Sequence, residues 1–215
     1  SSSGVLTFAS APDFETKSSY TATVTVSDGT NSTTQSVTVT ITDVNDVSPV
    51  FTSSASFSAA ENQTGVGTVT ATDTDSSSLT FSVSGSELSI SSSGVLTFAS
   101  APDFETKSSY TATVTVSDGE NSTTQNISVT VTDANDSAPT IRSGSSFTAA
   151  ENQTGIGSVS ASDPEGDSLG YSVSGSELLI SSSGVLTFAS VPDFETKSSY
   201  TAMITVSDGT NSTTQ

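Results

Sequence analysis

The chain has 215 residues and carries 4 basic and 23 acidic side chains, with no His, Cys or Trp, so its net charge is −19. This charge opposes binding to nucleic acid and to anionic membrane surfaces, which both need a basic face. The lack of Cys excludes disulfides, and no apolar run is long enough to insert into a bilayer. We expect no signal peptide within this sequence, and cations are the expected partners of so acidic a chain.

The sequence repeats every 90 residues, because residues 1–8, 91–98 and 181–188 are identical. The repeat predicts three domains: the C-terminal part of one unit at 1–47, a complete unit at 48–137, and a unit lacking its last strand at 138–215. We call them the first, second and third copies. Such copying is typical of an array of one folded unit and argues against a single-site enzyme. The chain starts inside a repeat without an initiator Met, so we expect it to be a window of a longer protein.

Alternating apolar and polar residues predict β-strands through the complete unit. The expected strands are residues 66–71, 79–83, 88–90, 95–98, 110–116 and 127–132. Their polar positions are mostly Thr, which is β-branched and suits an exposed strand face. Turn signals separate the strands, and no segment has a helical period. About seven short strands in a unit of this size predict an all-β fold of tandem immunoglobulin-like, Greek-key β-sandwiches in a linear array.

Most acidic residues lie at strand ends, in five motifs that recur in the same order. In the complete unit the motifs are Glu61, Asp73-Thr74-Asp75, Asp103-Phe104-Glu105, Asp118 and Asp133-Ala134-Asn135-Asp136. Of the 23 acidic residues, only Glu87, Glu120, Asp167 and Glu177 lie outside such motifs. A merely solvated acidic surface would scatter its charges over the exposed strand faces, which instead carry Ser and Thr. The pattern therefore favours cation sites.

These motifs resemble the cadherin repeat family, whose repeats carry a lone Glu, D-x-D, D-x-E, a lone Asp and an inter-repeat D-x-N-D-N before Pro. The resemblance covers the whole chain and implies cadherin-type sandwiches whose linkers each hold about three Ca²⁺ in oxygen ligands. Sandwich topology brings acids of two successive units to one linker. The predicted ligands of the first linker are Asp13, Glu15, Asp43, Asn45, Asp46, Asp73, Asp75 and Asp118. Those of the second are Glu61, Asp103, Glu105, Asp133, Asn135, Asp136, Asp163, Glu165 and Asp208. The resemblance implies that backbone carbonyls also contribute, near Val44 and Val47 in the first linker and near Ala134 and Ser137 in the second.

The chain departs from the family pattern at three places. Val47 and Ser137 stand where the family has the final Asn of the linker, a position that coordinates through its carbonyl. Proline replaces the usual Leu before each D-x-E, at Pro12, Pro102 and Pro192. The third copy has Asp163-Pro164-Glu165 in place of D-x-D, so we expect its cation site to be weaker or differently shaped.

The leading hypothesis is a calcium-rigidified rod and adhesion module of an extracellular or cell-surface adhesin or filament. Its partners would be calcium, neighbouring repeats and identical chains. The alternative is a carbohydrate-binding accessory module of a secreted protein, which the lack of Trp disfavours. Paired carboxylates such as Asp103 and Glu105 can serve glycoside hydrolysis, but they recur in every copy, so we expect no enzyme. The chain ends are either arbitrary cuts of an array or strand-donation ends, with Ser36–Thr42 completing another molecule.

Overall fold

The computed structural model describes residues 4–215, so residues 1–3, where the first predicted segment begins, lie outside the described chain. All regular elements of the described residues are β-strands, which confirms the all-β prediction. No helix long and apolar enough to cross a membrane occurs among them. The chain forms two compact units. Unit 1 comprises Ser1–Ala59, Gln63–Ala101 and Ser109–Thr130; unit 2 comprises Ala60–Asn62, Pro102–Ser108 and Val131–Gln215.

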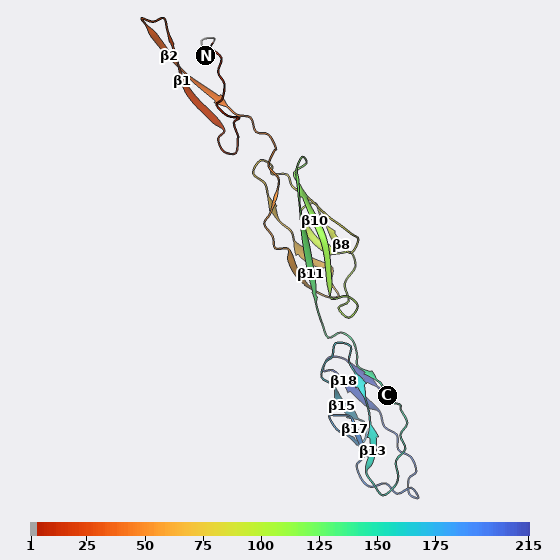
Figure 1. Cartoon of the computed structure of the whole chain (residues 1–215). Helices are drawn as coiled ribbons and strands as arrows, with labels where there is room; N and C mark the ends of the chain where they lie inside the picture. Colours follow the sequence, from red (N-terminus) through yellow and green to blue (C-terminus); the bar gives the residue numbers. More distant parts are fainter. Residues whose placement is uncertain (1–3) are drawn as a thin grey trace. The chain divides into compact units, whose positions relative to one another are not determined.

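The first copy contributes one antiparallel hairpin (Figure 1). Its strands are β1 (Ser19–Ser27) and β2 (Ser32–Thr40), paired from Ser19↔Thr40 to Ser27↔Ser32. Asp28 closes the turn between them, because its Oδ1 accepts the backbone N–H groups of Thr30 at 2.8 Å and Asn31 at 2.6 Å. This is an Asx-type turn, in which a short carboxylate accepts hydrogen bonds from backbone N–H groups of the turn.

The second copy contains nine strands in three sheets. The four-stranded sheet has the order β4 (Ser56–Ala60), β11 (Ser122–Thr132), β10 (Ser109–Ser117) and β7 (Thr80–Val83). The three-stranded sheet has the order β5 (Gly65–Thr68), β9 (Val95–Phe98) and β8 (Leu88–Ile90), and β3 (Val50–Phe51) pairs with β6 (Ala71–Thr72). The long β10–β11 hairpin therefore lies inside its sheet, with a strand on each outer side.

The predicted strand 66–71 is divided into β5 and β6, which pair with different partners. Between them Val69 is fully buried and donates its N–H to the carbonyl of Gly94 at 2.8 Å. Gly94 has φ +86°, and a Cβ at this position would overlap the Val69 carbonyl oxygen. Only glycine combines this backbone conformation with so close an approach. The strand thus switches sheets at Val69, a change that an unbroken alternation does not reveal.

The interior of the second copy is filled by the apolar positions of the alternating strands. Val114 and Val116 of β10 are both 0% exposed, as is Val129 of β11. Leu96 of β9 is equally buried. Burial of each such side chain stabilises the folded state by roughly 1.5–3 kcal/mol. A few fully buried residues therefore compensate for the low apolar content of the sequence.

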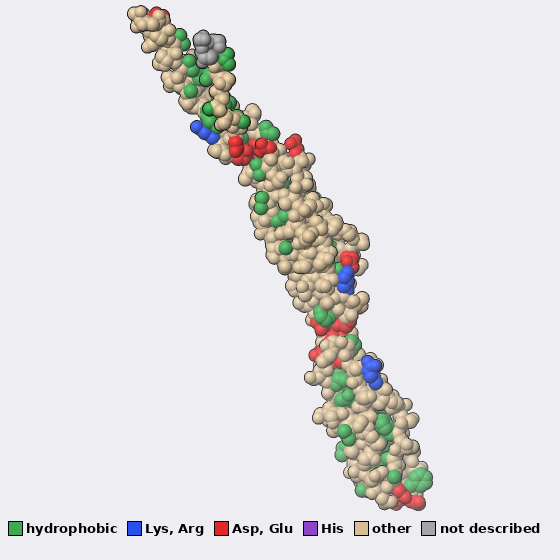
Figure 2. Space-filling model, viewed as in Figure 1, with side chains coloured by type: hydrophobic (Ala, Val, Ile, Leu, Met, Phe, Trp, Pro, Cys, Tyr) green, Lys and Arg blue, Asp and Glu red, His purple; other side chains and the backbone are tan. Residues whose placement is uncertain are grey.

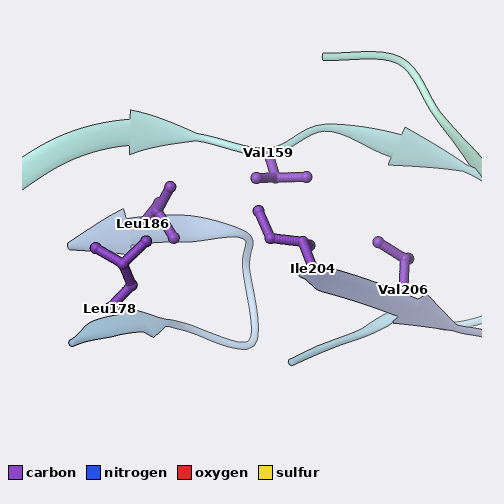
Figure 3. Close-up of a cluster of buried hydrophobic side chains, with 5 residues drawn as sticks. All are labelled: Val159, Leu178, Leu186, Ile204 and Val206. Atoms are coloured by element: carbon purple, nitrogen blue, oxygen red, sulfur yellow. The ribbon is translucent and has the colours of Figure 1, made fainter. Parts of the chain in front are cut away.

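The third copy repeats this arrangement, except that the counterparts of β10 and β11 are shorter and residues 146–150 form no counterpart of β4. Its sheets are β12 (Thr140–Ile141) with β14 (Ala161–Ser162); β13 (Gly155–Ser158), β17 (Val185–Phe188) and β16 (Leu178–Ile180); and β15 (Gly170–Val173), β18 (Ile204–Ser207) and β19 (Ser212–Thr214). Figure 3 shows its core, in which Val159, Leu178, Leu186, Ile204 and Val206 pack together. The tandem sandwiches predicted from sequence are confirmed, and they place the acidic motifs at strand ends.

Candidate functional site

The carboxylates gather in groups, and the strand faces between the groups carry few of them (Figure 2). Among the described residues, four groups of three acids each present oxygens that lie within 4.8 Å of one another. They are Asp73, Asp75 and Asp118; Glu61, Glu105 and Asp133; Glu105, Asp136 and Glu165; and Glu151, Asp193 and Glu195. The first group belongs to the first linker (residues 43–47), and the next two belong to the second linker (residues 133–137).

At the first linker, Asp75 fastens the linker backbone. Its Oδ2 accepts the N–H groups of Asp46 and Val47, both at 2.8 Å. The neighbouring Asp73 carboxyl group and the hydrogen bonds from these two N–H groups hold the pKa of Asp75 below its ordinary value, against the effect of desolvation. The other oxygen of Asp75, Oδ1, is buried without a partner.

Asp73 and Asp118 complete this group. Oδ1 of Asp73 accepts the N–H groups of Asp75 and Ser76 at 3.0 Å, while its Oδ2 is buried without a partner. Oδ1 of Asp118 accepts the N–H of Asn121 at 2.6 Å. Desolvation raises the pKa of Asp118, but the surrounding hydrogen bonds outweigh it and the net shift is downward. Three carboxyl groups thus converge at this linker.

The remaining acids of the first linker come from the first copy. Both oxygens of Asp13 accept hydrogen bonds from Thr16, and the side-chain bond is the main reason why the pKa of Asp13 is lowered. The backbone N–H of Glu15 lowers the pKa of the Glu15 carboxyl. Desolvation and the nearby Asp13 and Asp43 carboxyl groups together raise this pKa by more, so the net shift is upward. The raised pKa reports an accumulation of negative charge around Glu15.

At the second linker, Glu61 is the anchor. It is 5% exposed, and its two oxygens accept the N–H of Phe104 at 2.9 Å and of Ala134 at 2.7 Å. Next to it Asn62 has φ +61°, a left-handed conformation that Asn tolerates better than most residues. The Asn62 Nδ2 donates to Oδ2 of Asp136 at 2.5 Å. Backbone donors therefore hold Glu61 in place, and it stays close to Glu105 and Asp133.

Glu105 is the one acid shared by two of the groups. Its own backbone N–H lowers its pKa, but desolvation and repulsion from Glu61, Glu165 and Asp133 outweigh that bond, so the pKa is raised. The neighbouring Asp103 is used differently, because Thr106 donates to both of its oxygens at 3.0 Å. Thr106 accordingly lowers the pKa of Asp103.

The third copy supplies acids whose oxygens lack partners. Oδ2 of Asp163, both oxygens of Glu165 and Oδ2 of Asp208 are buried without a hydrogen bond. Glu165 lies within reach of Glu105 and Asp136. Its counterpart in the second copy, Asp75, instead groups with Asp73 and Asp118. Buried carboxylate oxygens without donors are unfavourable unless a cation supplies the missing charge. These oxygens fit hard divalent cations.

Two asparagines that sequence reasoning missed contact the linkers. Asn121 Nδ2 donates to Oδ1 of Asn45 at 3.2 Å and to the Val47 carbonyl at 3.3 Å. Asn211 Nδ2 donates to Oδ1 of Asn135 at 2.8 Å. Both follow a predicted acid by three residues, but Asn in a Ser/Thr-rich turn carries no distinctive sequence signal.

Other contributors were absent from the predicted site. The structure brings Glu151, Asp193 and Glu195 together, and the N–H of Phe194 donates to Glu151 as that of Phe104 does to Glu61. Their signal was present, since they repeat the motifs of the second copy. Asp167, which lies outside the motifs, accepts a hydrogen bond from Asn135 Nδ2 at 2.6 Å.

Solved structures with a similar fold are cadherin extracellular domains. The Protocadherin GammaB4 extracellular domain is 27% identical, with a TM-score of 0.77 over 96% of this chain and 37% of that one. Mouse Cadherin-23 EC22-24 is 21% identical, with a TM-score of 0.73 over 96% of this chain and 75% of that one. Mouse Protocadherin-24 EC1-3 is 23% identical, with a TM-score of 0.73 over 96% and 80%. The last two identities show the fold alone.

At the level of sequence the matching family is a different one. No curated protein matches the chain. The sequence model of the bacterial Ig domain matches residues 45–132 and 135–215, which is most of the chain. The resemblance to cadherin repeats thus holds for the fold, while membership of the cadherin repeat family is not shown. The chain belongs to the bacterial Ig domain family.

Proposed function

We propose that this chain is a calcium-binding segment of tandem repeats that serves as a structural rod and adhesion module of an extracellular or cell-surface protein. The observation that carries the proposal is the set of buried, partnerless carboxylate oxygens at both linkers. At the second linker they occur beside a Glu105 whose pKa neighbouring carboxylates raise. A cation bound to these oxygens would reduce the repulsion between the carboxylates and would serve as the partner that the oxygens lack.

Calcium suits these oxygens better than other common metals. Ca²⁺ accepts six to eight oxygen ligands in flexible geometry, whereas Mg²⁺ demands near-octahedral geometry and keeps several waters. Softer metals prefer His and Cys, and the chain has neither. In the first linker Asp73, Asp75 and Asp118 would hold the cation. In the second, the group of Glu61, Glu105 and Asp133 and the group of Glu105, Asp136 and Glu165 would do so, and Glu105 would belong to both.

The role as a rod follows from the repetition. Near-identical copies add length but little diversity of recognition, so the proposed role of calcium is to fix each linker. An extracellular location is proposed because the similar Protocadherin GammaB4 fragment is an extracellular domain and because extracellular modules bind calcium at about 10⁻⁴–10⁻³ M. Repetition of the acids at every linker also supports a binding module over an enzyme.

Neighbouring repeats of identical chains are the proposed protein partners. In the second copy, β11 buries Ile127 and Val129, which are 2% and 0% exposed. In the third copy a cavity of about 700 Å³ opens among apolar side chains that include Phe147, Leu178 and Phe188. We propose that a strand with the alternation of β11 fills this cavity.

The first copy offers such a strand. Val37 and Val39 of β2 alternate as Ile127 and Val129 do, and they line an apolar cavity of about 420 Å³. Sedimentation of the whole chain should show association that increases with concentration and that Val39→Asp abolishes. Thr38→Asp, on the opposite face of β2, is the matched control. A monomer at every concentration would contradict this partner.

Calorimetric titration of the whole chain with Ca²⁺ tests the proposed function. We expect binding in the range of about 10⁻⁴–10⁻³ M with several ions per chain. Titration with Mg²⁺ at the same ionic strength is the control for charge screening, and weaker binding is expected. Absence of Ca²⁺ binding, or equal binding of both cations, would overturn the proposal. A glycan array separates it from the carbohydrate-binding alternative, for which we expect no retention.

A further inference from the structure

The loops after β10 and β18 each carry an asparagine that reaches back to the preceding linker. In the second copy, Asn121 Nδ2 lies 3.2 Å from Oδ1 of Asn45, 3.3 Å from the Asn45 carbonyl and 3.3 Å from the Val47 carbonyl. It also lies 3.4 Å from Oδ2 of Asp118. One amide group thus faces four oxygens, two of them from the linker backbone.

The third copy reproduces the contact with different surroundings. Asn211 Nδ2 lies 2.8 Å from Oδ1 of Asn135, 3.5 Å from its carbonyl and 3.2 Å from the Ser137 carbonyl. The repetition matters because the acids around the two linkers differ, with Glu165 replacing Asp75. A contact that survives this change belongs to the repeat itself.

The loop conformation that presents the amide is built locally. In the second copy Asp118 accepts the N–H groups of Glu120 and Asn121, and in the third copy Asp208 accepts that of Asn211 at 2.6 Å. The same loop occurs in the first copy, where Asp28 accepts the N–H of Asn31 at 2.6 Å. Asn31 is exposed, and no linker precedes it within residues 4–215. The loop conformation therefore forms in all three copies, whereas the contact of its asparagine with a linker occurs, among the described residues, only in the second and third copies.

We infer that Asn121 and Asn211 are positioning residues that fasten each linker to the repeat that follows it, before a cation binds. An amide suits this role because it donates hydrogen bonds without adding positive charge. A Lys or Arg side chain would compete with a cation for the same carboxylates, whereas an amide leaves their charge intact. The Asn45 and Asn135 oxygens keep a second lone pair for a metal ion.

The effect on linker motion is independent of calcium, while the effect on calcium affinity rests on the proposed function. Hydrogen bonds of this kind contribute modestly, so removal of the amide should weaken Ca²⁺ binding at that linker about fivefold. In chelator the same change should broaden the distribution of distances across the linker. Asn121→Asp should broaden it equally, because the carboxylate cannot donate to the linker oxygens.

Spin labels measure these distances directly, since the native chain has no Cys. Exposed Thr34 and Ser89 report on the first linker, and exposed Ser82 and Ser172 report on the second. In chelator, Asn121→Ala should broaden only the first distribution and Asn211→Ala only the second. The matched control is Asn31→Ala, which changes the same loop without a linker and should leave both distributions unchanged.

The outcomes distinguish the two proposals. If Asn31→Ala acts like Asn121→Ala, or if neither Asn121→Ala nor Asn121→Asp broadens the distribution, the inference is wrong even when calcium binds normally. If the distributions respond as expected but the native chain binds no calcium, the inference stands and the proposed function fails. If Asn121→Asp tightens Ca²⁺ binding and leaves the chelator distribution narrow, the residue is a metal ligand, and the positioning role is overturned.

Discussion

The two linkers have nearly the same sequence pattern, yet they group their acids differently. In the first, Asp75 lies with Asp73 and Asp118, and its carboxylate holds two N–H groups of the linker. In the second, Glu165 replaces Asp75 and lies with Glu105 and Asp136. The side chain of Glu165 is one methylene longer than that of Asp75, and its carboxylate joins a different group of acids. The comparison teaches that the repeat fixes where acids lie, while side-chain length selects which acids meet.

The largest expected effect comes from Glu105→Gln at the second linker. Glu105 takes part in two acidic groups, so loss of its charge should weaken Ca²⁺ binding there by about tenfold or more. Calorimetry measures the loss. The control is Glu120→Gln, because Glu120 is exposed and lies outside all four groups. Equal effects of the two substitutions would show that overall charge, and not the grouping, governs binding.

A smaller effect is expected from making the second linker resemble the first. Glu165→Asp shortens the side chain, so its carboxylate should retreat from Glu105 and Asp136 and weaken Ca²⁺ binding about threefold to tenfold. The charge is unchanged, so any loss reports on geometry. Glu120→Asp is the matched control for the same shortening outside the linkers. A Ca²⁺ affinity of Glu165→Asp equal to that of the native chain would show that side-chain length at this position does not distinguish the two linkers.

The smallest effect concerns Asp167, which has Ser77 as its counterpart in the second copy. Asp167→Ser removes the acceptor for Asn135 Nδ2, an exposed contact, and should lower the free energy of unfolding by about 0.5 kcal/mol or less. Thermal unfolding in chelator measures it. A loss of several kcal/mol would mean that Asp167 helps to define the second linker.

Much of the fold was predictable from alternation and repetition. The strands at 110–116 and 127–132 correspond to β10 and β11, because Val114, Val116 and Val129 repeat every second residue and are buried. The division of residues 66–71 was not predictable, since it depends on the contact of Val69 with Gly94, a partner far along the chain. The domain limits at 47 and 137 stay predictions.

The candidate site was predictable only in part. The acids were found because they recur in motifs, and among residues 4–215 the structure brings eight of the fifteen predicted acids into groups of three. Asp103 and Asp13 were expected as ligands, yet Thr106 and Thr16 donate to both of their oxygens, a local use that the motif does not reveal. Asn121 and Asn211 were missed, because a residue that acts across 76 positions of sequence can be identified only when the fold is known.

The central claim is that calcium relieves the charge gathered at the linkers, and thermal unfolding of the whole chain tests it most directly. Melting temperatures are compared in excess Ca²⁺ and in chelator at equal ionic strength. The account predicts a higher melting temperature with Ca²⁺, because a ligand at about 100 times its dissociation constant stabilises the folded state by about 2.7 kcal/mol per site. Strand content in chelator should stay close to native, since Glu61 is the only acid among the buried side chains of residues 4–215. Identical melting temperatures in the two solutions would contradict the account.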